Sequence, residues 1–280
     1  MADPADFVLS LQNVNAVRIT DINDVRRAAE ALAAIALSMG GMRVAPAHDI
    51  ADKRTPVDAE GAILARDVFG WDGTDERVWW KNSRIALDSP ITTACRFESE
   101  PFWANAEGFR TRQPNPYLDA IDLSNFEQRA MTRTAIVVPV HLPFGQIGAV
   151  SFNPIDRSKT ELSEEFERYS DAFGIYGRTF IASYVHATGS IQRLPPGSRL
   201  SKREVECLRW AAVGKTDVEI AMILARSCAT VRFHIHNAAT KLEAVNRSQT
   251  VFKATQLGYL GSVAVSNGSH GEHHDGALID

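Results

Sequence analysis

Apolar residues recur at helical spacing in two long segments of the chain, Thr20–Met39 and Thr160–Ala187. In the first segment these positions are Ile22, Val25, Ala29, Leu32 and Leu37. In the second they are Phe166, Tyr169, Phe173, Phe180 and Tyr184. Side chains three and four residues apart share one face of an α-helix. The pattern predicts two amphipathic helices, the first stopped by Gly40 and the second capped by Ser163.

Between these segments, the apolar residues form runs of strand length. Ala135–His141 and Gly148–Phe152 are rich in β-branched and apolar residues, and LPFGQI joins them, which is typical of a hairpin. Two shorter apolar runs, Met42–Pro46 and Ala62–Phe69, have the length of further strands. Helices that flank strands in this order predict an α/β/α sandwich with a mostly antiparallel sheet.

The segment Leu200–Leu260 has a different pattern, with four short amphipathic stretches separated by turn signals. Ser201 and Glu204 have the spacing of a capping box at the start of the first stretch. Ser227 can cap the third, whose apolar positions are Val231, Ile235, Ala238 and Leu242. The fourth runs from Arg247 to Leu260. The sequence therefore predicts an all-α domain of four helices, and the whole chain is expected to be an α+β protein.

Charge is concentrated in this helical part. Residues 198–261 hold ten Lys and Arg against five Asp and Glu, whereas the first 197 residues have a balance of −6 and the whole chain one of −4. Binding to duplex DNA favours such a concentration because cations on the protein release counterions from the phosphates. Charge alone is equally typical of a solvated helical surface.

The polar face of the third stretch carries Arg232 and His236 one turn apart, flanked by Thr230 and Phe233. The N-terminal half of a recognition helix places base-reading side chains in the major groove in this way. On LSKREVECLRW, GKTDVEIAMIL, TVRFH and KL, the segment resembles the LuxR-type helix-turn-helix over essentially its whole length. The resemblance implies that the helix with TVRFHIHN reads DNA.

The predicted DNA contacts follow from that resemblance. Arg232, Phe233 and His236, with Thr230 beside them, are expected at base edges, and Lys215 and Lys241 at phosphates; these six residues are the predicted DNA-binding set. One position departs from the family pattern: Arg226 stands where an apolar residue usually precedes the capping Ser. An arginine buried there without a partner would be costly.

A second group of candidate residues lies between Arg77 and Phe109. Trp79, Trp80 and Trp103 flank the acid Asp88 in the sequence. Aromatic walls with one acceptor suit an apolar ligand that also has an amide N–H, since an amide buried without a partner costs about 1–3 kcal/mol. Tryptophans are also common in ordinary cores, and Asp before Ser-Pro is a common turn former. Residue types leave both interpretations open.

The stretch from Trp79 to Tyr184 resembles LuxR-family autoinducer-binding domains, because Asp88 and Trp103 keep the family's Asp-to-Trp interval. The resemblance implies that Asp88 accepts the amide of an N-acyl homoserine lactone and that Trp103 packs on its lactone end. Trp79 stands where the family has Tyr, and Ala135 where it has Gly. A further departure is that Ser89 separates Asp88 from the proline.

Proline, glycine and polar residues that interrupt the helical periodicity predict the domain boundaries. We expect a ligand-binding domain at 1–187, a linker at 188–197 that is rich in Pro and Gly, a helix-turn-helix domain at 198–262, and a flexible tail at 263–280. The N-terminus lacks the basic start and apolar run of a secretory signal, and no apolar run is long enough to cross a bilayer. The expected location is the cytoplasm, with no membrane partner and three reduced cysteines.

Catalytic motifs are not found. The sequence has no GxSxG, HExxH, P-loop or glycine-rich dinucleotide turn, and its histidine-rich tail is more typical of a disordered segment than of a metal site. We therefore expect neither an enzyme nor a metal, and no cofactor apart from the signal ligand.

Together these features predict a quorum-sensing transcription regulator that binds N-acyl homoserine lactone and a pseudo-palindromic operator as a homodimer. The family suggests that the last helix pairs the two DNA-binding heads and that RNA polymerase is a further partner. The alternative is a regulator of the same type that responds to a different signal or to none. A response regulator and a lactone-processing enzyme fit less well, because the acidic receiver pattern and catalytic motifs are not found.

Overall fold

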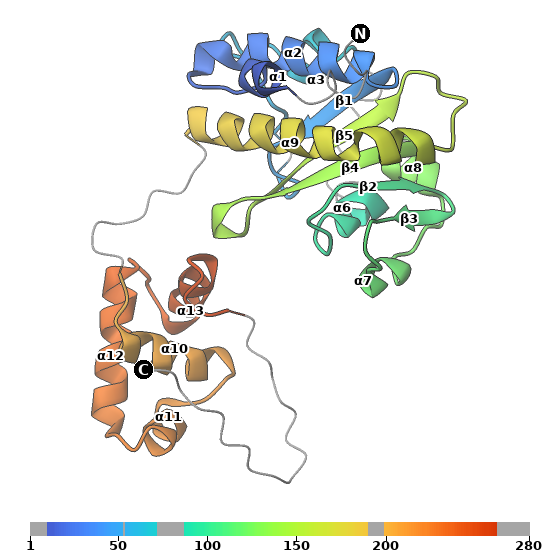
Figure 1. The fold of residues 1–280 in the computed structure, drawn as a ribbon. Helices are drawn as coiled ribbons and strands as arrows, with labels where there is room; N and C mark the ends of the chain where they lie inside the picture. The colour runs from blue at the N-terminus through green and yellow to red at the C-terminus, as the bar shows by residue number, and fades with distance from the viewer. Residues whose placement is uncertain (1–9, 53, 72–86, 190–198, 262–280) are drawn as a thin grey trace. The chain divides into compact units, whose positions relative to one another are not determined.

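The computed structural model describes residues 10–52, 54–71, 87–189 and 199–261 (Figure 1). The chain divides into two compact units, Met1–Gln192 and Arg193–Asp280. Trp79, most of the predicted linker and the predicted tail lie outside the described residues.

The N-terminal unit is built on a five-stranded sheet in the order β1-β5-β4-β2-β3. The strands are β1 (Met42–Ala47), β2 (Phe102–Asn105), β3 (Gly108–Arg110), β4 (Thr134–His141) and β5 (Ile147–Pro154). Each neighbouring pair is antiparallel, and the predicted hairpin is the β4–β5 pair, with Val138 opposite Val150. The predicted antiparallel sheet and hairpin are confirmed.

One predicted strand is wrong. The run Ala62–Phe69 contains the short helix α3 (Leu64–Asp67), and only Ile63 makes an isolated bridge, to Val57. Leu64 and Phe69 are both buried, and the amide of Asp67 donates to the carbonyl of Ile63. Both side chains join the same apolar cluster, whereas residues five apart on a strand would point to opposite faces of the sheet.

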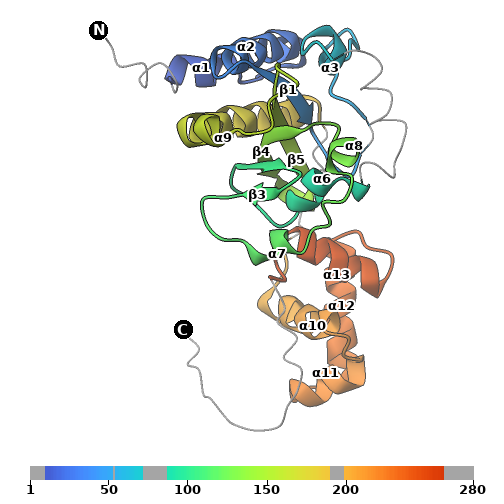
Figure 2. The same cartoon turned by 90° about the vertical axis from the view of Figure 1, so that its right-hand side faces the viewer.

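One face of the sheet is covered by α1 (Leu11–Ala16), the short 3₁₀ turn η2 (Ile22–Asp24), α2 (Val25–Ser38) and α9 (Ser163–Ala187) (Figures 1 and 2). The two predicted amphipathic helices are confirmed as α2 and α9, and Gly40 follows α2 at φ +83°. Leu37 is nevertheless 58% exposed, because it lies five residues after Leu32 and so leaves the buried stripe, which Ile35 continues.

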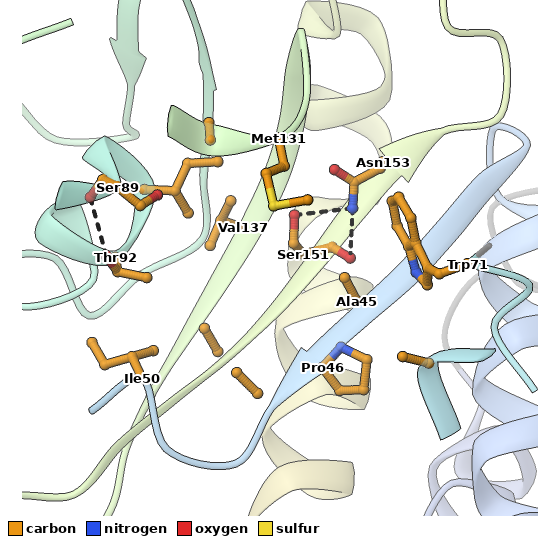
Figure 3. A pocket seen from close by; sticks show the side chains of 15 residues that line it. Ala45, Pro46, Ile50, Trp71, Ser89, Thr92, Met131, Val137, Ser151 and Asn153 are labelled. Atoms are coloured by element: carbon orange, nitrogen blue, oxygen red, sulfur yellow. Dashed lines mark hydrogen bonds between the residues drawn. The ribbon is translucent and has the colours of Figure 1, made fainter. Parts of the chain in front are cut away.

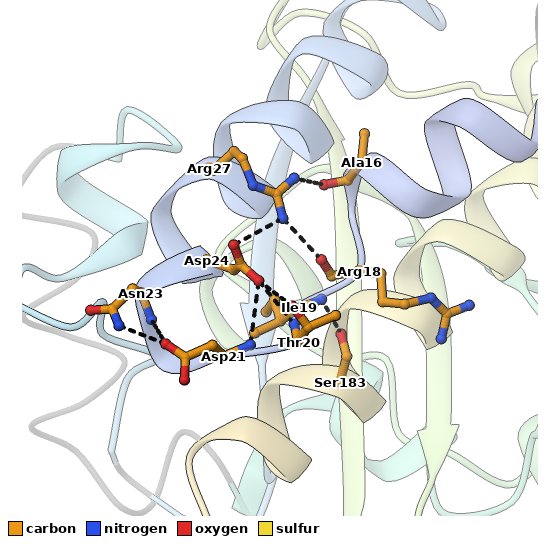
Figure 4. A network of polar contacts seen from close by, with 9 residues as sticks. All are labelled: Ala16, Arg18, Ile19, Thr20, Asp21, Asn23, Asp24, Arg27 and Ser183. Atoms are coloured by element: carbon orange, nitrogen blue, oxygen red, sulfur yellow. Dashed lines mark hydrogen bonds and ion pairs between the residues drawn. The ribbon is translucent and has the colours of Figure 1, made fainter.

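Polar contacts fix the turn between α1 and α2 to the rest of this layer (Figure 4). The carboxylate of Asp24 accepts from the amide and hydroxyl of Thr20, and the guanidinium of Arg27 donates to the carbonyls of Ala16 and Arg18. The amide of Ile19 donates to Ser183 Oγ on α9 at 3.0 Å. Ser163, the predicted cap of α9, is instead its first residue, and its amide donates to Glu161.

The opposite face of the sheet carries shorter helices: α6 (Pro90–Ala94), α7 (Pro116–Asp119) and α8 (Phe126–Ala130), which cover a second apolar cluster. Ser89 is the N-cap residue of α6, and Pro90 occupies its first position. Proline fits there because its missing N–H would have no helical partner. At this N-cap position Ser89 is fully buried.

The C-terminal unit is all-α and contains the four predicted helices: α10 (Lys202–Ala212), α11 (Asp217–Ile223), α12 (Cys228–Lys241) and α13 (Arg247–Gln256). The capping box of Ser201 with Glu204 and the cap at Ser227 are both present. The fourth helix is shorter than predicted, because Gly258 at φ +75° turns the chain and Leu260 folds back into the core. The predicted α+β class is confirmed.

Candidate ligand pocket and DNA-binding surface

The N-terminal unit has a partly open cavity of about 130 Å³ on the sheet face that the short helices cover (Figure 3). Its lining residues come from β1, β4 and β5, from α3, α6 and α8, and from residues that precede or follow these elements. They are Ala45, Pro46, Ala47, Ile50, Ala65, Trp71, Ser89, Ile91, Thr92, Ala130, Met131, Val137, Ala149, Ser151 and Asn153. An apolar cavity of about 150 Å³ holds benzene in an engineered protein, so this space is large enough for part of an acyl or aryl group.

The cavity exists because the strands place small side chains on this face. Ala45 of β1 and Ala149 and Ser151 of β5 lie there, whereas Val150 and Phe152 lie on the other face with α9. Alternate residues of a strand point to opposite faces of the sheet. Large residues therefore fill the sheet face that α2 and α9 cover, and the small residues leave room on the opposite face, where the cavity lies.

The polar groups at the cavity are neutral. Asn153 is 5% exposed, and its Nδ2 donates to the carbonyl and hydroxyl oxygens of Ser151 at 3.2 and 3.1 Å. Thr92 Oγ1 donates to the carbonyl of Ser89 at 3.1 Å. Ser89 Oγ is buried and has no hydrogen-bond partner among the described residues. A buried hydroxyl without a partner is costly, so Ser89 is the group that would gain most from a polar ligand atom.

The structure does not bring the predicted ligand residues together at this cavity. Asp88 is exposed, and its backbone carbonyl accepts from Arg129 at 2.6 and 3.0 Å. Trp103 is buried in the apolar cluster under α2 and α9, on the other face of the sheet from the cavity. It is paired with Ile136 of β4, and the guanidinium of Arg110 lies over the Trp103 ring. Ala135 packs under the short helices without lining the cavity.

Sequence reasoning missed Trp71, Met131 and Asn153, and gave Ser89 no role in binding. Trp71 lies before the stretch that resembles the ligand-binding domains, and its Nε1 donates to the carbonyl of Val44 at 2.7 Å. The usable signal was Pro90: a proline at the first position of a helix fixes the preceding residue as the cap. That residue is Ser89, one place beyond Asp88.

In the C-terminal unit, α11 and α12 form the helix-turn-helix. Ala225 adopts φ +49° in the turn, Arg226 is exposed, and Ser227 Oγ accepts from the amide of Thr230 at 3.1 Å. Arg226 therefore avoids burial by pointing to solvent. Arg232, Phe233 and His236 are exposed on α12, and Phe233 is 60% exposed although its side chain is apolar.

Three of the predicted DNA contacts already have carboxylate partners. Arg232 Nε lies 3.4 Å from Asp217, whose carboxylate also pairs with Arg247. Lys241 Nζ donates to both oxygens of Glu204 at 2.8 and 2.9 Å. Burial on its own raises the pKa of Glu204, but hydrogen bonds from Lys241 and the Ser201 amide more than offset this and hold that pKa below its ordinary value. Lys215 makes a looser pair with Glu219 at 3.5 Å.

Two further properties hold for the described residues. No group of His, Cys, Asp and Glu among them could hold a metal ion. Their helices include none with the length and apolar character needed to span a membrane.

Several known proteins are similar to parts of this chain. Residues 198–254 match the family described as bacterial regulatory proteins, luxR family. Transcriptional activator protein AhyR of Aeromonas hydrophila is 30% identical over 181 residues, which are 64% of this chain and 67% of AhyR. Transcriptional activator protein VanR of Vibrio anguillarum is 36% identical over 127 residues, which are 44% of this chain and only half of VanR. The solved structure of Escherichia coli SdiA is 21% identical, with a TM-score of 0.47 over 89% of this chain and 95% of that one.

The chain thus combines a cavity-bearing α/β/α unit with a helix-turn-helix unit. The chain belongs to the LuxR family of bacterial regulatory proteins. The resemblance that the C-terminal motifs indicated is thereby confirmed.

Proposed function

We propose that this protein is a ligand-responsive transcription regulator that acts by binding and not by catalysis. Its helix-turn-helix unit binds double-stranded DNA, and its N-terminal unit binds an acyl-chain signal such as N-acyl homoserine lactone. The observation that carries the proposal is the cavity next to the buried Ser89 hydroxyl, which has no hydrogen-bond partner among the described residues, in a chain that also has a helix-turn-helix unit. The names of AhyR and VanR as transcriptional activators, and of RpaR from Rhodopseudomonas palustris as a quorum sensing-dependent regulator, support it.

The same proposal includes a homodimer on a pseudo-palindromic operator in the cytoplasm, with RNA polymerase as a further partner. Two helix-turn-helix heads related by a two-fold axis read two half-sites about one helical turn apart. The exposed apolar side chain of Phe252 on α13, 59% accessible, supports this helix as the element that pairs the heads.

The ligand part is tested by thermal unfolding of the full chain with a series of N-acyl homoserine lactones. A ligand present at 100 times its dissociation constant stabilises a folded protein by about 2.7 kcal/mol. We expect one range of chain lengths to raise the Tm, and Ser89→Ala to reduce the shift more than Asp88→Ala does. No shift with any lactone would exclude lactone sensing and leave DNA binding untouched.

The DNA part is tested by comparing binding to a selected operator and to random DNA. Arg232→Ala should reduce this discrimination by about 1–3 kcal/mol if the guanidinium reads a base. Arg209→Ala is the matched control, because Arg209 is an exposed arginine of α10 and is not on the proposed recognition helix α12. Equal loss of discrimination in both variants would show a general charge effect and no base contact by Arg232.

The main alternative is a regulator of this family whose signal is not a lactone. One observation favours it: among the described residues that line the cavity there is no carboxylate to accept an amide, and Asp88 is exposed elsewhere.

A further inference from the structure

A second basin adjoins the ligand cavity and differs from it in charge. It has a volume of about 220 Å³ and shares Trp71, Met131 and Asn153 with the cavity. Its charged lining residues are Arg43, Arg133, Arg157, Lys159 and Glu127. A space bordered by four cations and one carboxylate therefore shares a wall with an apolar cavity.

The cations of this basin differ in the partners that they have among the described residues. Arg133 pairs with Glu127, and Lys159 pairs with Glu165. Arg43 is half-buried, and no ion pair to a carboxylate is found for it among the described residues; its guanidinium carbon lies 5.1 Å from the centroid of the Trp71 ring. A guanidinium held over an aromatic ring keeps its in-plane N–H donors available, and a planar carboxylate can accept two of them.

The sheet register places Arg43 on the same side as the cavity. Arg43 of β1 is the direct partner of Asn153 of β5 in the antiparallel ladder, so both side chains lie on the pocket face. Figure 3 shows Ser89 at one end of the cavity and Trp71 at the other, with Met131 and Asn153 between them. The apolar cavity thus has a neutral hydroxyl at one end and the cationic basin at the other.

We infer that the cavity and the basin together bind an amphipathic carboxylate. This inference rests on the proposed function, because it names the chemical class of the signal. The acyl or aryl body of the ligand lies against the small residues of β1 and β5, and its carboxylate accepts hydrogen bonds from Arg43 beside the Asn153 amide. Arg133 and Lys159 add positive potential, although each has a partner.

The test uses pairs of ligands that differ mainly in charge. N-decanoyl homoserine lactone and its ring-opened form, N-decanoyl homoserine, share the acyl chain and the amide, but only the open form has a carboxylate; decanoate and methyl decanoate are a second pair. Binding of each to the full chain is measured by isothermal titration calorimetry. We expect the carboxylate of each pair to bind more tightly, with an advantage that decreases as salt is added.

Arg43→Gln should then weaken carboxylate binding about tenfold to a hundredfold, the range of a charge-assisted hydrogen bond, and change binding of the neutral compounds much less. Arg168→Gln is the matched control, because Arg168 also stacks over an aromatic ring, that of Tyr169 at 5.4 Å, but lies outside the basin. If Arg43→Gln fails to fold, the wild-type comparison within each pair still decides the question.

The outcomes separate the inference from the proposed function. Lactone binding that equals or exceeds carboxylate binding would overturn the inference and keep a lactone receptor. Tight carboxylate binding that Arg43→Gln leaves unchanged would overturn the assignment of Arg43. Failure of all four compounds to bind would overturn both the inference and acyl-signal sensing, whereas carboxylate binding that depends on Arg43 would support both.

Discussion

At the scale of single residues, the Glu204–Lys241 pair shows how a predicted DNA contact can have a structural task. The Glu204 side chain is 4% exposed and that of Lys241 is 36% exposed, so removal of the lysine leaves a buried carboxylate without its cation. Lys241→Met should destabilise the C-terminal unit by about 1–3 kcal/mol. Urea unfolding of the full chain followed by circular dichroism measures this loss.

The salt dependence of DNA binding shows whether Lys241 also contacts phosphate. A phosphate contact would lower the slope of log K against log salt by about 1 in Lys241→Met. We expect an unchanged slope, because Nζ donates to both Glu204 oxygens.

The contribution of the Glu204–Lys241 pair to stability should also decrease in acid. The pKa of Glu204 in the folded state is lowered. The pair therefore stabilises the fold above the ordinary pKa of 4.5, and this stabilisation is lost as the pH falls through the folded-state pKa.

His48 makes the stability of the N-terminal unit depend on pH. The dependence has the opposite sign to that of an ion-paired histidine, which stabilises the fold at low pH. Its ring is buried beside Tyr184, 5.7 Å between centroids, and burial lowers the pKa of His48 below its ordinary value of 6.5. The unfolded chain therefore binds a proton more readily, and stability falls as the pH drops below about 6.5. His48→Gln should show a smaller decrease in Tm between pH 8 and pH 5.5 than the wild type. Equal decreases in both proteins would contradict this account.

At the scale of elements, the small side chains of β1 and β5 determine whether a ligand can enter. Ala45 lies on the pocket face of β1, where a phenylalanine would occupy the cavity. Ala45→Phe should abolish the ligand-induced rise in Tm and leave the DNA affinity of the ligand-free chain unchanged, since it alters only the N-terminal unit. Calorimetry with the tightest ligand measures the first effect. A ligand that still binds this variant with wild-type affinity would exclude the cavity as its site.

Elements with a local signal could be predicted from sequence. The helices α2, α9 and α10 follow from apolar spacing and caps, and the β4–β5 hairpin follows from two apolar runs around a turn. The position of Trp103 could not be predicted in this way. All four residues of β2, Phe102–Asn105, are buried, so burial does not alternate and the sequence does not show which of them faces the ligand side. The pairing with β4, a long-range contact, decides it.

At the scale of the whole molecule, the sequence pattern separated two units because the apolar periodicity and the charge both change between them. The structure has two compact units, Met1–Gln192 and Arg193–Asp280. How a signal in the first alters DNA binding by the second is a linkage question: a ligand changes DNA affinity only by as much as it discriminates between the DNA-bound and free states. Either sign of regulation is compatible with the same cavity.

The proposed dimer makes a geometric prediction about DNA. Two heads joined by a two-fold axis fit half-sites about 10 base pairs apart, and insertion of about 5 base pairs turns one half-site to the opposite side of the duplex. An operator selected from random DNA with the full chain should therefore lose at least tenfold in affinity on that insertion and regain part of it with about 10 base pairs, because the half-sites then face the same side again. Electrophoretic mobility shifts at fixed salt measure the three affinities. A chain that binds through one head would give the same affinity for all three spacings, since each half-site would act alone.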